Sequence, residues 1–204
     1  MMVFLLGGIT GTILETIWVL LLSSNLQWRS GLILVPIHPI YAVGALLMTV
    51  CLRPLYKFRF RHVAVFFGAA VIGSSFEFLA SVIQSFLFKS NSWEYSQQPL
   101  NLGGRTSLSM ALIWGVLGLF WILLALPRLL RFIDSIEPRT MHRLAGFGAC
   151  LFLTAAIISV VAVCRWEMRD SGYAGTSAFG TFIDTLFPDR IMTIFYPTLK
   201  FIPR

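Results

Sequence analysis

The stretch HVAVFFGAAVIGSSFEFLASVIQSFLF, residues 62–88, is apolar over more than the thickness of a bilayer core. A helix needs about 20 mostly apolar residues to cross that core, and this stretch contains a single carboxylate, Glu77. An ionisable side chain in lipid requires a partner, a proton or a water-filled cavity. The stretch therefore predicts a membrane-spanning helix that carries a functional polar group.

Composition extends this interpretation to the whole chain. Of the 204 residues, 57% are hydrophobic and 12% are charged, which is far more apolar than an ordinary soluble domain. We therefore predict an all-α, polytopic helical membrane protein, with a transmembrane bundle at 1–164 and an amphipathic membrane-surface tail at 165–204. The five predicted spans lie at roughly 3–23, 31–52, 63–88, 106–126 and 144–164.

The net charge of +7 does not indicate a nucleic-acid partner, because the basic residues flank the predicted spans. Two connections are strongly basic, which by the positive-inside rule places them and the N-terminus in the cytoplasm. An odd number of spans puts the tail outside, although it is basic too, so its side stays open. The basic residues are Arg53, Lys57, Arg59 and Arg61 in one connection, Arg128, Arg131, Arg139 and Arg143 in the other, and Arg165, Arg169, Arg190, Lys200 and Arg204 in the tail.

Polar residues inside the spans lie at helical spacings. The third span has a polar stripe, and the first carries Glu15 on a face with Gly8 and Gly11, where another helix can approach closely. The stripe consists of Ser74, Glu77, Ser81, Gln84 and Ser85. Packing alone explains small residues better than it explains glutamates.

The second span contains Pro36 and Pro39, which remove two amide donors and interrupt a helix. His38 stands between them. It is suited to relay a proton, bind a metal or pair with a glutamate, or simply to bond a freed carbonyl as a neutral ring. At 1.5 Å per residue, His38, Glu15 and Glu77 lie at similar depths in the outer half of the membrane. We therefore expect these three residues to share one site.

The connection WEYSQQPLNLGGR, residues 93–105, is expected to fold back over the bundle. Its aromatic residues favour a membrane interface, and Pro99 with Gly103 and Gly104 favours turns. Arg105 carries a planar, permanently charged group suited to a carboxylate or an anionic headgroup, and it equally suits an interfacial anchor. The candidate binding residues of this connection are Trp93, Glu94, Tyr95, Asn101 and Arg105.

The tail changes character after the fifth span. Phe179, Phe182, Ile183, Leu186 and Phe187 recur at helical spacings around Asp184 and Thr185. This pattern predicts a short amphipathic helix rather than a further span.

The order of these elements resembles the putative ABC-transporter type IV (CmpB-like) family of bacterial membrane permeases. The resemblance rests on Gly11-x-x-x-Glu15, Pro36-x-x-Pro39-Ile40-Tyr41, Glu77, the 93–105 connection, Trp114-Gly115 and Phe187-Pro188-Asp189. It implies transport in the bacterial cytoplasmic (inner) membrane. The chain has no ATP-binding P-loop, so any ATPase would be a separate subunit.

Three functional classes remain open. A permease would pass a small solute or proton through a polar cavity lined by Glu15, His38 and Glu77, with the 93–105 connection as an outer lid. An intramembrane enzyme would act on a lipid, with Arg105 holding an anionic headgroup, but no nucleophile–base pair or metal motif supports it. A structural or regulatory subunit would use the polar groups mainly for packing. A homodimer partner would supply the missing half of a pathway. We expect no cofactor, metal or nucleic acid.

Overall fold

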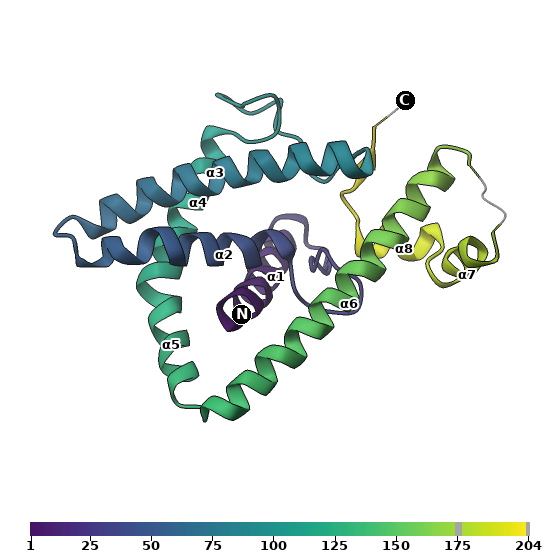
Figure 1. Ribbon diagram of the computed structural model, residues 1–204. Helices are drawn as coiled ribbons and strands as arrows, with labels where there is room; N and C mark the ends of the chain where they lie inside the picture. Colours follow the sequence, from purple (N-terminus) through teal and green to yellow (C-terminus); the bar gives the residue numbers. More distant parts are fainter. Residues whose placement is uncertain (174–176, 203–204) are drawn as a thin grey trace.

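The computed structural model describes residues 1–173 and 177–202 and consists mainly of helices, with little strand (Figure 1). Five continuous helical stretches in it are long and apolar enough to cross a membrane. This confirms the prediction of an all-α, polytopic membrane protein. The stretches are α1 (Met2–Ser23), α2 (Pro39–Leu52) with the 3-10 turn η1 (Arg53–Lys57), α3 (Arg61–Phe88), α4 (Leu108–Leu119) with the π-helical segment η2 (Phe120–Ala125) and α5 (Leu126–Asp134), and α6 (Pro138–Asp170).

The second span begins later than we predicted. Residues 31–38 are not helical, and α2 starts at Pro39 with His38 as its N-cap. Gly31 and Leu34 have positive φ angles of 68° and 76°, which no right-handed helix accommodates. Pro36 also disfavours helical geometry in the residue before it. The prolines therefore end an irregular segment and start a helix, instead of breaking one.

This irregular segment is nonetheless packed into the protein. Ile33 is 1% exposed, and its N–H donates to Ser159 Oγ of α6 at 2.9 Å. The N–H of His38 donates to the carbonyl of Gly8 in α1 at 3.2 Å. These bonds satisfy backbone groups that have no helical partner, as a low-dielectric environment requires.

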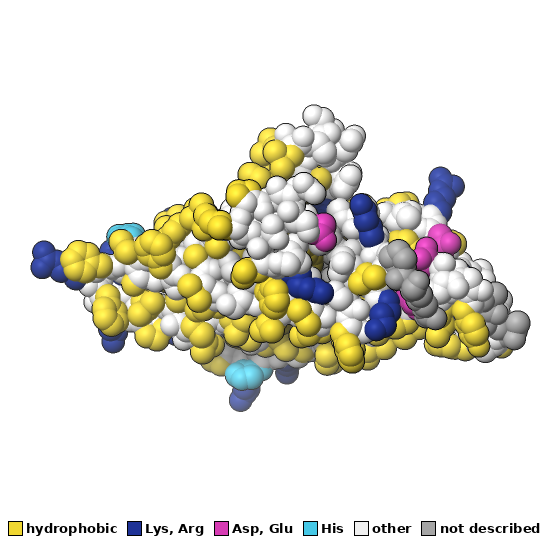
Figure 2. All heavy atoms as spheres, turned by 90° about the horizontal axis from the view of Figure 1, so that it is seen from above, with side chains coloured by type: hydrophobic (Ala, Val, Ile, Leu, Met, Phe, Trp, Pro, Cys, Tyr) yellow, Lys and Arg dark blue, Asp and Glu magenta, His cyan; other side chains and the backbone are white. Residues whose placement is uncertain are grey.

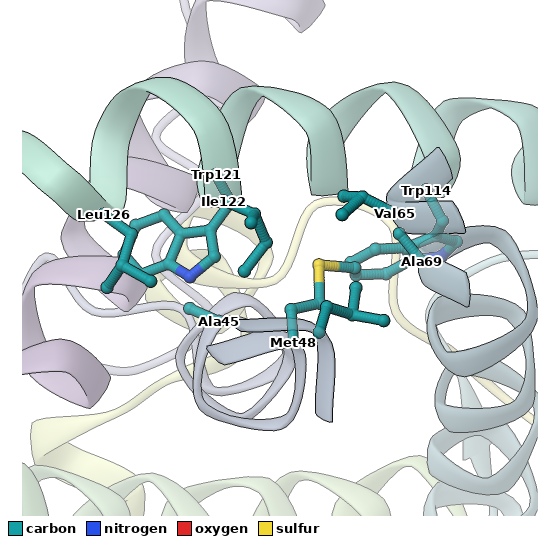
Figure 3. Close-up of a cluster of buried hydrophobic side chains, with 9 residues drawn as sticks. Ala45, Met48, Val65, Ala69, Trp114, Trp121, Ile122 and Leu126 are labelled. Carbon is teal, nitrogen blue, oxygen red and sulfur yellow. The ribbon is translucent and has the colours of Figure 1, made fainter. Parts of the chain in front are cut away.

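Small residues allow the central helices to approach closely. A Cβ at Gly11 of α1 would lie 2.1 Å from Tyr41 Cβ of α2, and a Cβ at Gly73 of α3 would lie 2.3 Å from Trp114 Cγ of α4. Around these contacts the core joins α2, α3 and the α4–α5 stretch (Figure 3). Its buried members are Ala45, Met48, Leu52, Val65, Ala69, Trp114, Trp121, Ile122 and Leu126. Hydrophobic side chains also cover much of the face shown in Figure 2, as expected for a surface in contact with lipid.

The tail packs at the end of the bundle where α1 finishes. Strand β2 (Lys200–Phe201) pairs antiparallel with β1 (Ser90–Asn91) beyond the end of α3. Met192 of α8 (Asp189–Phe195) is fully buried in a cluster with Ile33 and Trp166. The N-terminal residues instead lie with Ile133 and Met141, beside the turn between α5 and α6. The tail therefore lies at the opposite end of the bundle from the N-terminus.

Ion pairs explain how a basic segment occupies that end. Arg165 and Arg169, near the end of α6, both pair with Asp184 of α7 (Ala178–Leu186). Arg169 also lies 2.7 Å from Asp189. These two arginines are therefore balanced by carboxylates of the tail itself. Helix α7 buries Ile183 and leaves Phe179, Phe182 and Leu186 exposed.

We expect the docking of α7 to weaken in acid. Arg165, together with Arg169, holds the pKa of Asp184 below its usual value. A lowered folded-state pKa contributes stability that is fully present above about pH 4, the unfolded value, and is lost as the pH falls through the folded value. Amide exchange across 178–186, corrected for its intrinsic pH dependence, should therefore rise at low pH.

The same docking should fail at neutral pH in Asp184→Asn. The matched control is Asp170→Asn, at the exposed end of α6, which should leave exchange in α7 unchanged. Equal exchange in the two variants would refute the role of the Asp184 ion pairs.

Candidate functional site

Glu15 projects from α1 into an ion-paired cluster with residues of the segment that follows the helix. Its Oε1 accepts from Arg29 Nε at 3.0 Å and lies 2.9 Å from Arg29 Nη2. Its Oε2 lies 3.6 Å from His38 Nε2. The side chains of Glu15, Arg29 and His38 are 16–17% exposed. The carboxylate is thus held by two basic side chains, with limited access from outside.

Glu77 is more deeply buried, at 5% exposure. Its Oε1 accepts from the hydroxyl of Tyr95 at 3.1 Å, and its Oε2 accepts from Thr106 Oγ1 at 2.8 Å. Both donors belong to the connection between α3 and α4, which folds back along α3, as we expected from its sequence. Each oxygen of this buried carboxylate therefore has a hydrogen bond.

Tyr41 interacts with both carboxylates. Its ring centroid is 5.0 Å from that of His38 and 6.0 Å from that of Trp114. Its phenol interacts with Glu15 and, over a longer distance, with Glu77 and Tyr95. Tyr95 in turn interacts with both glutamates. The structure thus brings two distant parts of the sequence into one group, the carboxylate cluster: Glu15, Arg29, His38, Tyr41, Glu77, Tyr95 and Thr106.

Three other candidates shape the 93–105 connection and lie outside this cluster. The indole N–H of Trp93 donates to the carbonyl of Arg105 at 3.0 Å. The exposed carboxylate of Glu94 accepts from the hydroxyl and N–H of Ser96, and these bonds lower the pKa of Glu94. Asn101 donates to the carbonyl of Gln98 at 2.9 Å and accepts from the N–H of Gly104 at 3.0 Å. These bonds fix the turn that holds Tyr95 over Glu77.

Arg105, the last candidate, points along α3 away from the carboxylate cluster. Its Nη1 donates to Ser81 Oγ at 2.9 Å and to Ser85 Oγ at 2.8 Å. We considered a carboxylate as its partner, but in the described part of the chain no carboxylate oxygen lies within 4.0 Å of it.

Two grooves lie away from these polar residues. One, of about 370 Å³, is lined by N-terminal residues with Ile133, Met141 and His142. The other, of about 490 Å³, lies between the start of α3 and the α4–α5 stretch, beside Tyr56 and His62. Over residues 1–173 and 177–202, no group of three or more His, Cys, Asp or Glu side chains is arranged to hold a metal ion.

Sequence reasoning missed three members of the carboxylate cluster. Arg29 stood as a single basic residue in an outer connection, and Thr106 as an ordinary start of a span. Tyr41 was part of the proline motif but was not selected, because its spacing gives no sign of the partner helix that it faces. A lone arginine soon after a span that contains a glutamate is the signal that would have identified Arg29.

The comparison with known families agrees with this architecture. The sequence profile of one family matches residues 2–160, from the start of α1 to late in α6. No curated protein and no solved structure matches the chain. Because the family match covers more than half of the sequence, the chain belongs to the family described as putative ABC-transporter type IV.

Proposed function

We propose that this protein is a permease-type membrane subunit that moves a proton, or a small solute together with a proton, past the carboxylate cluster. The family description as a putative ABC transporter supports a role in transport. Carboxylates within spanning segments are expensive in lipid, and proton relays are one of their main uses.

One observation carries the proposal: the hydroxyl of Tyr95 donates to Glu77 at 3.1 Å, and Tyr41 and Tyr95 both interact with Glu15 as well as with Glu77. A phenolic hydroxyl both donates and accepts a hydrogen bond, so Tyr95 would give its own proton to Glu77 and take a replacement proton from the side of Tyr41 and Glu15. Glu15 and His38 are partly exposed, while Glu77 is buried. A proton would therefore enter at Glu15 and His38 and reach Glu77 through the tyrosines.

The proposed setting is a bacterial cytoplasmic membrane, with the N-terminus in the cytoplasm and the 93–105 connection covering the outer end of the route. Trp93, Glu94 and Asn101 would fix that cover in place. Arg105 would bind the solute at the inner face of the cover. A separate ATPase subunit or a second copy of the chain would complete the transporter, since a five-helix bundle of this size offers few surfaces for a whole pathway.

Proton flux in proteoliposomes tests this proposal. Vesicles that contain a pH-sensitive dye are energised with a potassium gradient and valinomycin, and the acidification rate is measured. We expect Glu77→Gln to reduce the protein-dependent rate about 100-fold, since it removes a group that must accept a proton. Tyr95→Phe should slow it as well, because the ring remains and only the relay hydroxyl is lost.

The control is Glu137→Gln, which neutralises an exposed carboxylate next to α6 and should leave the flux unchanged. Size-exclusion profiles and unfolding midpoints in detergent establish that each variant is folded. Wild-type flux in folded Glu77→Gln and Glu15→Gln would refute the route. Loss of folded protein in both variants would instead assign the cluster a structural role.

A further inference from the structure

We propose that Arg105, with Ser81 and Ser85, forms a binding site for an oxyanion, a carboxylate or phosphate group, about one helical turn from Glu77. The site lies in the same region as the carboxylate cluster. That its ligand also passes through the protein rests on the proposed function.

The charge of Arg105 is balanced differently from that of the half-buried arginines that form ion pairs. Arg29 pairs with Glu15, and Arg165 and Arg169 share Asp184. Arg105 is half-buried as well, yet its described contacts are two neutral hydroxyls. A buried charge normally needs an opposite charge. A single bound anion would balance the charge of Arg105.

The geometry of the guanidinium fits a bidentate ligand. Both bonds to Ser81 and Ser85 come from Nη1. A guanidinium has five N–H donors in a planar fork, and Nε and Nη2 of Arg105 make no hydrogen bond to the described residues. These two nitrogens form the edge that binds the two oxygens of a carboxylate or phosphate side by side.

Apart from the exposed Glu94, the side chains around Arg105 described here are polar and neutral. Ser85 Oγ donates to Asn91 Oδ1 at 2.8 Å, and Gln84 Nε2 donates to Ser92 Oγ at 2.7 Å. Glu94, which interacts with Arg105 over a longer distance, is exposed and already bonded to Ser96. Hydroxyls and amides beside a free arginine edge favour an oxyanion, and they offer no carboxylate that would attract a cation.

Two sources can supply this chemistry, a lipid headgroup phosphate or a free oxyanion. The two sources are distinguished by the lipid composition of the bilayer in which the protein is tested. In the first arm, the full chain is placed in nanodiscs of phosphatidylcholine and titrated calorimetrically with inorganic phosphate and with acetate, with chloride as the ionic-strength control. In the second arm, the discs contain phosphatidylglycerol, and native mass spectrometry measures how much of it co-purifies with the protein.

We expect Arg105→Gln to weaken binding of the effective probe about 10- to 100-fold, the effect of losing charge-assisted hydrogen bonds. Arg105→Lys keeps the charge without the fork, and Ser81→Ala keeps Arg105 but removes one of the two hydroxyls that orient it. Both should bind more weakly than wild type, and they serve if Arg105→Gln does not fold. Arg131→Gln is the matched control, because Arg131 is an exposed arginine of α5, and it should bind like wild type.

Saturable phosphate or acetate binding in phosphatidylcholine discs that depends on Arg105 supports the site with a free anion as its ligand. Enrichment of phosphatidylglycerol alone, lost in the Arg105 variants, supports it with a lipid ligand. The proposal is overturned if wild type binds none of the probes, or if folded Arg105 variants bind them as wild type does. If the protein binds no anion while Glu77-dependent proton flux persists, the anion site is refuted and the proposed function stands. If Arg105-dependent anion binding persists while the protein carries no proton flux, the anion site stands and the proposed function is refuted.

Discussion

Gly73→Ala is expected to lower the free energy of unfolding by about 3 kcal/mol or more, the upper end of the range for overpacked cores. The new Cβ would lie 2.3–2.6 Å from Cβ, Cγ and Cδ2 of Trp114. These atoms are at the base of the indole and cannot move aside by a change of rotamer alone. The clash therefore has to separate α3 from α4, and Trp114 belongs to the buried core that holds both helices against α2.

Unfolding midpoints in detergent measure this effect. The matched control is Gly146→Ala in α6, where a Cβ would meet no described atom within 4 Å, and it should leave the midpoint unchanged or slightly raised through helix propensity. Equal midpoints for wild type and Gly73→Ala would mean that α3 and α4 do not pack as described. Because α4 follows directly from Thr106, the same substitution should also disturb the contacts of Glu77.

Arg29→Gln is expected to destabilise the protein by about 2 kcal/mol, between the small effect of exposed ion pairs and the 3–5 kcal/mol of fully buried ones. The substitution leaves Glu15 with His38, at 3.6 Å, as its remaining close basic partner. It also releases the segment before α2, because the side chain of Arg29 connects this segment to α1 and to Thr198 of the tail.

A double-mutant cycle isolates the pair. Arg29→Gln combined with Glu15→Gln should be clearly more stable than the sum of the single effects predicts, because the double variant contains no uncompensated charge. Thr198→Ala is the control for the tail contact of Arg29 and should have little effect. Additive single effects would show that Glu15 and Arg29 do not stabilise each other.

Both predictions concern contacts that place the carboxylate cluster, and they show why its geometry depends on packing. Gly11 lets Tyr41 lie against α1, and Gly73 lets Trp114 lie against α3. The aromatic row of His38, Tyr41 and Trp114 then runs from the Glu15 side of the cluster towards Glu77. Larger residues at these glycines would move the helices apart and separate the two carboxylates.

Much of the fold could be predicted from the residues alone. Spans of about 20 apolar residues are recognisable because lipid excludes unsatisfied backbone groups and charges along the whole length of a helix. The start of the second span was predicted too early, because residues 31–38 are as apolar as a helix would be. The prolines disfavour a helix here, and the contacts of Ile33 and His38 stabilise the irregular form, in which Gly31 and Leu34 have positive φ angles.

The candidate site divides in the same way. Glu15, His38 and Glu77 stood out in the sequence because a polar group in lipid has a high cost. Their partners Arg29, Tyr41 and Thr106 did not, since each is an ordinary residue until a distant segment lies beside it. Arg105 was predicted to be a binding residue, which stays a prediction. That it bonds to Ser81 and Ser85 and not to a carboxylate depended on how the 93–105 connection turns.

The sequence by itself therefore determined that this protein lies in a membrane, how many spanning helices it has and where along the spans its charged residues lie. Hydropathy acts locally along the chain, so these features can be predicted without the tertiary structure. The tertiary structure decided which charges are paired, how the tail is neutralised and held at one end, and that Arg105 keeps a free edge. Those outcomes depend on hydrogen bonds and ion pairs between residues far apart in the sequence, and such contacts exist only once glycine-mediated packing has brought the helices together.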